Sequence, residues 1–177
     1  MERRDALKHA AAIVATALIV LAIYVLNPAS FLKDRLGDFG YAGVFLIMLV
    51  SSATVFLPVP GFLVIPALGA AYNPFLVGIA GGLGSAIGEL SGYLFGFGGQ
   101  SLLDKHNAWH TKLTVWMTQK GFLTILALSF VPNPFFDIAG VVAGASGYPW
   151  WKFFFACLIG KTARCILFAY LGKALIP

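Results

Sequence analysis

Charged side chains are scarce in this chain of 177 residues. Asp, Glu, Lys and Arg together make up 11% of the sequence, hydrophobic residues make up 59%, and the stretch from Phe39 to Gly88 contains no charge. A soluble domain of this size would need much more polar surface to face water. The scarcity of charge therefore excludes a water-soluble domain and predicts an integral membrane protein built of helices.

Patterns that bind metals or support catalysis are also missing. Cys157 and Cys165 lie eight residues apart in one apolar run, too far along a helix for a disulfide, and are expected to be small buried side chains. No CxxC or HExxH motif occurs, and the pair His106 and His110 near Asp104 lacks a third strong ligand. We therefore expect no metal, no cofactor and no enzyme activity. We also expect no nucleic-acid partner, because the basic residues are too scattered to form a binding patch.

The apolar segments differ in length, and their lengths predict different roles. Residues 1–38 would hold a basic tail, a retained anchor helix at Ala10–Leu26 and a short connection, and residues 39–177 a second domain. Within that domain, residues 74–98 and 150–173 are long enough to cross a bilayer as transmembrane helices. Residues 99–120 are polar and resemble an interfacial segment. The apolar arms within 41–72 and 121–148 are too short to cross, so each pair is expected to form a re-entrant hairpin.

Each predicted hairpin is broken by a Pro-x-Pro motif. The breaks involve Pro58, Pro60, Gly61, Pro132 and Pro134. The hairpins form an internal repeat, because each is followed by a second proline and a full-length helix.

A shift of 75 residues places Pro74 over Pro149 and Glu89 over Arg164. One crossing separates the two hairpins, so the second starts from the opposite face and the repeat is inverted, as in many transporters. Backbone that breaks at depth is tolerated only inside protein or beside a wet cavity.

Basic residues predict the orientation. With a cytoplasmic N-terminus, seven fall inside (Arg3, Arg4, Lys8, Lys105, Lys112, Lys120 and Lys152) and three outside (Lys33, Arg35 and Lys173). The small size and the lack of sorting tails favour a multi-pass protein of a prokaryotic plasma membrane. The sequence leaves open whether the protein forms a homo-oligomer.

Four charged residues fall within apolar segments, where charge is costly and therefore suggests function: Glu89, Asp137, Lys161 and Arg164. We expect them to line one polar cavity for a lipid headgroup. Asn133 would cap the returning half-helix, whose free N–H groups can receive a phosphate. Alternatively, Glu89–Arg164 and Asp137–Lys161 are buried ion pairs that only fix helix register.

Glycines recur at every fourth position of the first long segment, at Gly84, Gly88, Gly92 and Gly96. In a helix they form one stripe along which another backbone can approach closely, so they predict a helix-packing face.

The stretches "FVPNPFFDIAGVVAG" and "PWWKFFFACLIGK", together with the Glu89–Tyr93 piece, resemble the VTT domain, also called the DedA or SNARE-associated Golgi protein family. The resemblance covers roughly residues 40–172, and "PNPFFDIAG" and "LIGK" are most similar to its vacuole membrane protein branch. It implies two inverted re-entrant hairpins and movement of lipids between leaflets, by scrambling of phospholipids or by recycling of undecaprenyl phosphate with proposed proton coupling.

Many bacterial members of this family have acidic residues in the first hairpin and an arginine before the proline motif of the second. This chain has neither: its first hairpin has no acidic residue, and Ser129-Phe130-Val131 contains no arginine. These two departures argue against proton-coupled transport and favour passive scrambling. The expected partner is a membrane lipid with an anionic or phosphate headgroup. A proton-coupled carrier of small solutes that uses Glu89, and a scaffold without transport that binds partners through residues 99–120, are the alternatives.

Overall fold

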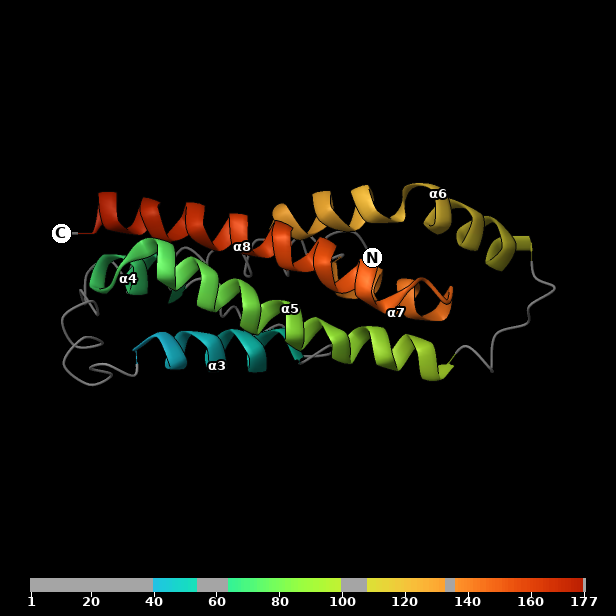
Figure 1. Cartoon of the computed structure of the whole chain (residues 1–177), viewed down its shortest axis with the longest axis horizontal. Helices are drawn as coiled ribbons and strands as arrows, with labels where there is room; N and C mark the ends of the chain where they lie inside the picture. Colours follow the sequence, from blue (N-terminus) through green and yellow to red (C-terminus); the bar gives the residue numbers. More distant parts are fainter. Residues whose placement is uncertain (1–39, 54–63, 100–107, 133–135, 177) are drawn as a thin grey trace, which may run out of the picture.

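The structure, a computed structural model, describes residues 40–53, 64–99, 108–132 and 136–176. In these ranges the chain forms only helices: α3 (Gly40–Ala53), α4 (Val64–Ala71), α5 (Pro74–Gly98), α6 (Ala108–Phe130), α7 (Phe136–Ala145) and α8 (Trp150–Leu175) (Figure 1). The predicted anchor helix and several predicted site residues (Pro58, Pro60, Gly61, Asn133 and Pro134) lie outside the described residues. The prediction of a helical protein is confirmed.

Two of these helices, α5 and α8, are long and apolar enough to cross a membrane. Asn73 begins α5, because its side-chain oxygen accepts hydrogen bonds from the backbone N–H groups of Phe75 (3.0 Å) and Leu76 (3.4 Å). Pro74 occupies the first turn, where a missing N–H has no cost. The chain leaves α7 through Gly147, whose φ of 69° closes the turn before α8.

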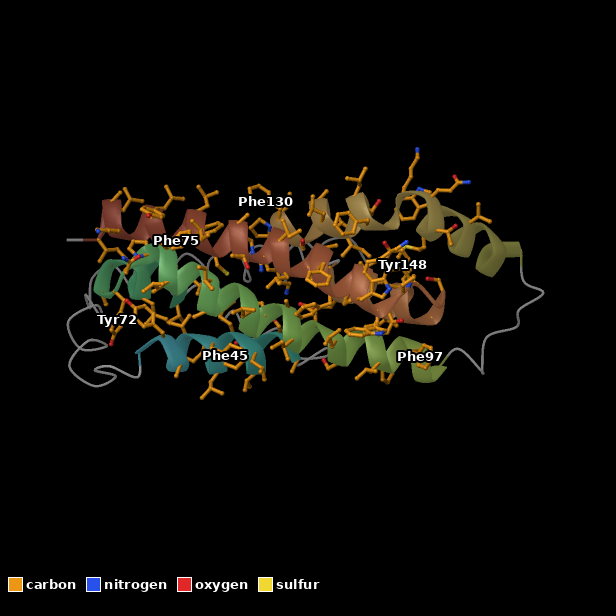
Figure 2. All side chains as sticks on the ribbon, viewed as in Figure 1. Phe45, Tyr72, Phe75, Phe97, Phe130 and Tyr148 are labelled. Carbon is orange, nitrogen blue, oxygen red and sulfur yellow. The ribbon has the colours of Figure 1, made fainter. Side chains whose placement is uncertain are left out.

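Large apolar side chains project outward from the long helices (Figure 2). They include Leu94 and Phe95 on α5, Leu123 on α6, and Phe155 and Leu171 on α8, each at least 44% exposed. An apolar exterior of this extent is unfavourable in water and suits contact with lipid chains.

Helix α6 runs without a break from Ala108 to Phe130. It therefore continues across residue 120, where the sequence changes from the polar segment 99–120 to the apolar segment 121–148. Gly121 does not interrupt it, since one glycine within a helix costs only about 1 kcal/mol. The helix ends two residues before Pro132, as expected where a proline restricts the residue before it.

The long helices α5 and α8 pack against each other and run in opposite directions (Figure 1). Helix α3 packs along α5, and α6 packs along α8. The short helices cross over: α4 packs mainly on α8, and α7 mainly on α5. Each long helix therefore carries one longer and one shorter neighbour.

Glycines set the close approach of α4 to α8. A Cβ atom at Gly69 of α4 would overlap the backbone of Ala169, and one at Gly172 of α8 would overlap the backbone of Pro66. Each helix thus offers a glycine to the other's main chain, so the two backbones lie nearly in contact.

The same reciprocal arrangement holds α7 against α5. A Cβ atom at Gly144 of α7 would overlap the backbone of Tyr93, and one at Gly96 of α5 would overlap the backbone of Val141. Both interfaces between a short and a long helix are therefore built in the same way.

The predicted glycine stripe of α5 faces two different helices. Gly84 and Gly88 lie against the backbone of α3, next to Phe45 and Leu49, whereas Gly96 lies against α7. Gly92, between them, is buried. One stripe thus serves α3 along its first half and α7 near its end.

Candidate functional site

Glu89 of α5 and Lys161 of α8 form a buried ion pair at the centre of the bundle. Lys161 Nζ donates a hydrogen bond to Glu89 Oε1. The side chain of Lys161 is 4% exposed and that of Glu89 is 5% exposed. Removing two opposite charges from water costs several kcal/mol per ion, and close pairing offsets that cost. The sequence predicts both residues as site residues, and the structure brings them into direct contact.

Two further helices contribute to the surroundings of Lys161. Its amino group also lies 3.4 Å from Ser52 Oγ, near the end of α3. It sits over the ring of Phe136, the first residue of α7, at 4.8 Å from the ring centroid. One ammonium group therefore contacts side chains from α3, α5 and α7.

Asp137 and Arg164 complete the charged group. Asp137 lies in the first turn of α7, where the helix dipole favours a negative charge. The charges of both residues act on the Glu89 carboxylate, Asp137 by repulsion and Arg164 by attraction, and Lys161 attracts Asp137. The four predicted charged residues thus belong to one electrostatic cluster.

The cluster lies where two helices end next to the predicted breaks. Helix α3 ends at Ala53, and residues 54–63 follow; helix α7 begins at Phe136, directly after residues 133–135. Pro132, the described member of the second break, is exposed after the end of α6.

Ser52 and Phe136 are members of this site that the sequence analysis does not select. Ser52 stands in an uncharged apolar run, and Phe136 is one of many phenylalanines, so neither residue type is distinctive. Their positions, shortly before the first predicted break and shortly after the second, are the only sequence signal.

Ser85, one helical turn before Glu89, is the other buried polar residue on this part of α5. It is fully buried, and its hydroxyl has no hydrogen-bond partner among the described residues. Within those same ranges no group of three His, Cys, Asp or Glu side chains could hold a metal ion. Cys157 and Cys165 are buried and free.

The cluster gathers two cationic and two anionic side chains within an apolar bundle. The Lys161 ammonium and the Arg164 guanidinium groups are its cations, and the Glu89 and Asp137 carboxylates are its anions. With all four groups ionised, the charges of the cluster balance.

Comparison with known proteins places the chain in a family. A family model described as the VTT domain matches residues 59–174. A stretch of 41 residues is 56% identical to vacuole membrane protein KMS1 of Arabidopsis thaliana. Stretches of 42 residues are 54% and 52% identical to the vacuole membrane protein 1 homolog of Dictyostelium discoideum and to human vacuole membrane protein 1.

These matches cover 23–24% of this chain and about a tenth of the length of each relative. A comparison with solved structures finds no match to the chain. Because the family model spans most of the residues that form α4 to α8, the match includes both long helices and the whole charged cluster. The chain belongs to the VTT domain family of membrane proteins.

Proposed function

We propose that this protein moves phospholipids or polyprenyl-phosphate lipids between the two leaflets of a membrane, as a scramblase or flippase-like transporter. One observation carries the proposal: the buried cluster around Glu89 and Lys161 lies where the ends of α3 and α7 meet the two long helices. Ionisable groups inside an apolar bundle commonly mark a path for polar substrates.

The fold of this transporter would be an inverted repeat of re-entrant hairpins, α3 with α4 and α6 with α7. The repeated contacts support this: α3 and α6 pack on the long helix of their own unit, and α4 and α7 on that of the other. Gly144 follows Gly69 by 75 residues, and Val141 follows Pro66 by the same number. This is the shift that superimposes the prolines before α5 and α8, and inverted repeats commonly bind substrates at their shared midplane.

Lipid passage would proceed by exchange of partners at Lys161. A lipid phosphate that reaches the cluster replaces the Glu89 carboxylate on the ammonium group, and Arg164 adds a second positive charge. The acyl chains stay outside, against the apolar exterior of the helices. The shortness of α3 and α7 would leave only a thin hydrocarbon barrier for the headgroup to pass.

Leaflet exchange can be measured with the purified chain in liposomes that contain a fluorescent lipid bleached from outside by dithionite. We expect bleaching beyond the outer-leaflet fraction, slowed by Lys161→Gln and unaffected by Lys173→Gln, which changes an exposed lysine in the last turn of α8. No exchange above protein-free liposomes would overturn the proposal.

The same preparation separates the other candidate functions. A flux driven by a pH gradient that disappears in Glu89→Gln, with no lipid exchange, would identify a proton-coupled carrier. Absence of both fluxes would favour a membrane scaffold.

A further inference from the structure

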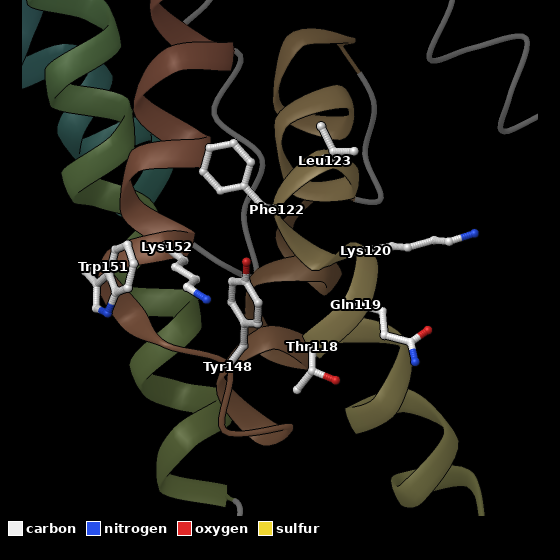
Figure 3. A pocket seen from close by; sticks show the side chains of 8 residues that line it. All are labelled: Thr118, Gln119, Lys120, Phe122, Leu123, Tyr148, Trp151 and Lys152. Atoms are coloured by element: carbon white, nitrogen blue, oxygen red, sulfur yellow. The ribbon is translucent and has the colours of Figure 1, made fainter.

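A recess between α6 and α8 lies apart from the Glu89–Lys161 cluster. It has a volume of about 230 Å³, and Figure 3 shows the side chains that line it. Its floor is near Tyr148, which precedes α8, and Trp151 and Lys152 of the first turn of α8 form one wall. The other wall comes from α6 and consists of Thr118, Gln119, Lys120, Phe122 and Leu123.

The polar part of this recess favours an anion. The described residues that line it include two lysines, Lys120 and Lys152, and no acidic side chain. In Figure 3 Lys152 extends across the recess toward Tyr148, whereas Lys120 lies at the rim and points away. Lys152 is therefore the cation best placed to contact a bound group.

Tyr148 is held firmly in place. Its backbone carbonyl accepts a hydrogen bond of 2.6 Å from the hydroxyl of Tyr93, and its ring packs on Gly121. A tyrosine hydroxyl is protonated at neutral pH, and burial raises the pKa of Tyr148 further, so this hydroxyl can donate a hydrogen bond to a phosphate oxygen.

The rest of the recess suits lipid rather than a free ion. Trp151 is half exposed, and the amino group of Lys152 lies 5.3 Å from the centroid of its ring. Tryptophan and lysine together are typical of the level of lipid headgroups. On the opposite wall Phe122 and Leu123 are exposed, 36% and 68%, and provide an apolar track beside the recess.

We propose that this recess is a binding site for one anionic glycerophospholipid, with its phosphate at Lys152 and Tyr148 and an acyl chain along Phe122 and Leu123. The volume is below the ~300 Å³ of the smallest sites for drug-sized ligands, so it admits a headgroup and not a whole lipid. The proposal requires only that the protein sits in a bilayer, and it does not depend on leaflet exchange.

Trp151 provides a local probe. Replacing Trp109, Trp116 and Trp150 by phenylalanine leaves it as the single tryptophan of the full chain. In nanodiscs, its fluorescence is then measured as phosphatidylglycerol or phosphatidylcholine with brominated acyl chains is titrated in. We expect phosphatidylglycerol to quench at about fivefold lower mole fraction, the effect of one lysine near an anionic surface.

The variant Lys152→Gln should remove the preference, while Lys152→Arg should keep it. Lys173→Gln is the matched control, an exposed lysine at the other end of α8, and should quench like the parent. Equal quenching by both lipids in the parent, or equal effects of Lys152→Gln and Lys173→Gln in variants with the parent's unfolding temperature, would overturn the proposal. So would full displacement by inorganic phosphate, which would identify a free-anion site.

Discussion

Lys161 of α8 binds the carboxylate of Glu89 of α5, 72 residues earlier in the chain. This contact joins two helices that are long and apolar enough to cross a membrane, at a point that α3 and α7 also reach. The pair therefore has two roles to separate by experiment, the stability of the bundle and the proposed exchange of a lipid phosphate at Lys161.

Breaking the pair on one side should be costly. Glu89→Gln leaves the Lys161 ammonium buried without its carboxylate, and we expect a loss of about 3–5 kcal/mol in the free energy of unfolding. The double variant Glu89→Gln with Lys161→Met should recover most of this loss, because neither charge then remains to be solvated. Unfolding in detergent micelles measures both, and strictly additive effects would contradict the coupling.

Filling a glycine contact should destabilise the crossing of α5 and α7. A methyl group at Gly96 would overlap the Val141 backbone, so Gly96→Ala should cost about 1–3 kcal/mol. Gly98→Ala is the matched control, since its added methyl group has no neighbour within 4 Å among the described residues, apart from the helix's own backbone and the adjacent residues. The control should be neutral or slightly stabilising in the same unfolding measurement. Equal unfolding temperatures for the two variants would mean that the close approach is not required.

Removing the hydroxyl of Tyr93 should loosen the turn between α7 and α8. Tyr93→Phe leaves the buried carbonyl of Tyr148 without this 2.6 Å bond, at a cost of about 1 kcal/mol. Tyr170→Phe, at an exposed position of α8, should change little. Amide hydrogen exchange at Gly147 and Tyr148 should speed up only in the first variant, and unchanged exchange there would argue against the bond.

The start of α5 depends on its cap. Asn73→Ala removes the acceptor for the N–H groups of Phe75 and Leu76 and should cost about 1 kcal/mol. Asn73→Asp keeps an oxygen acceptor and should retain the stability of the parent. Thermal unfolding measures both variants. An equal loss of stability in Asn73→Ala and Asn73→Asp would contradict a stabilising role for the side-chain oxygen of Asn73.

Local signals in the sequence account for much of the fold. Asn73-Pro74 and the following apolar run give the start and length of α5, and the proline before Trp150 gives the start of α8. These signals act within a few residues, through caps, prolines and segment length. The change from polar to apolar residues near residue 120 predicts a boundary, yet α6 continues through it, because a change of polarity alone does not end a helix and one glycine costs little.

The members of the charged cluster are also predictable, because charge in an apolar run is rare. The partner of each charge is not. The repeat predicted from the sequence would place Glu89 and Arg164 at equivalent positions, yet the Glu89 carboxylate binds Lys161, one turn earlier on α8. The rotation of each helix about its own axis decides which of its side chains faces the neighbouring helix. The spacing of residues along one helix does not determine this rotation.

The crossed packing of the short helices affects how the protein is made. Helix α4 leaves the ribosome long before α8, the helix on which its glycine face rests. During synthesis that face of α4 therefore has no helix to pack on until α8 has been made, and other apolar surroundings, such as lipid, must cover it in the meantime. Each half of the bundle therefore lacks part of its packing surface until the other half has been synthesised.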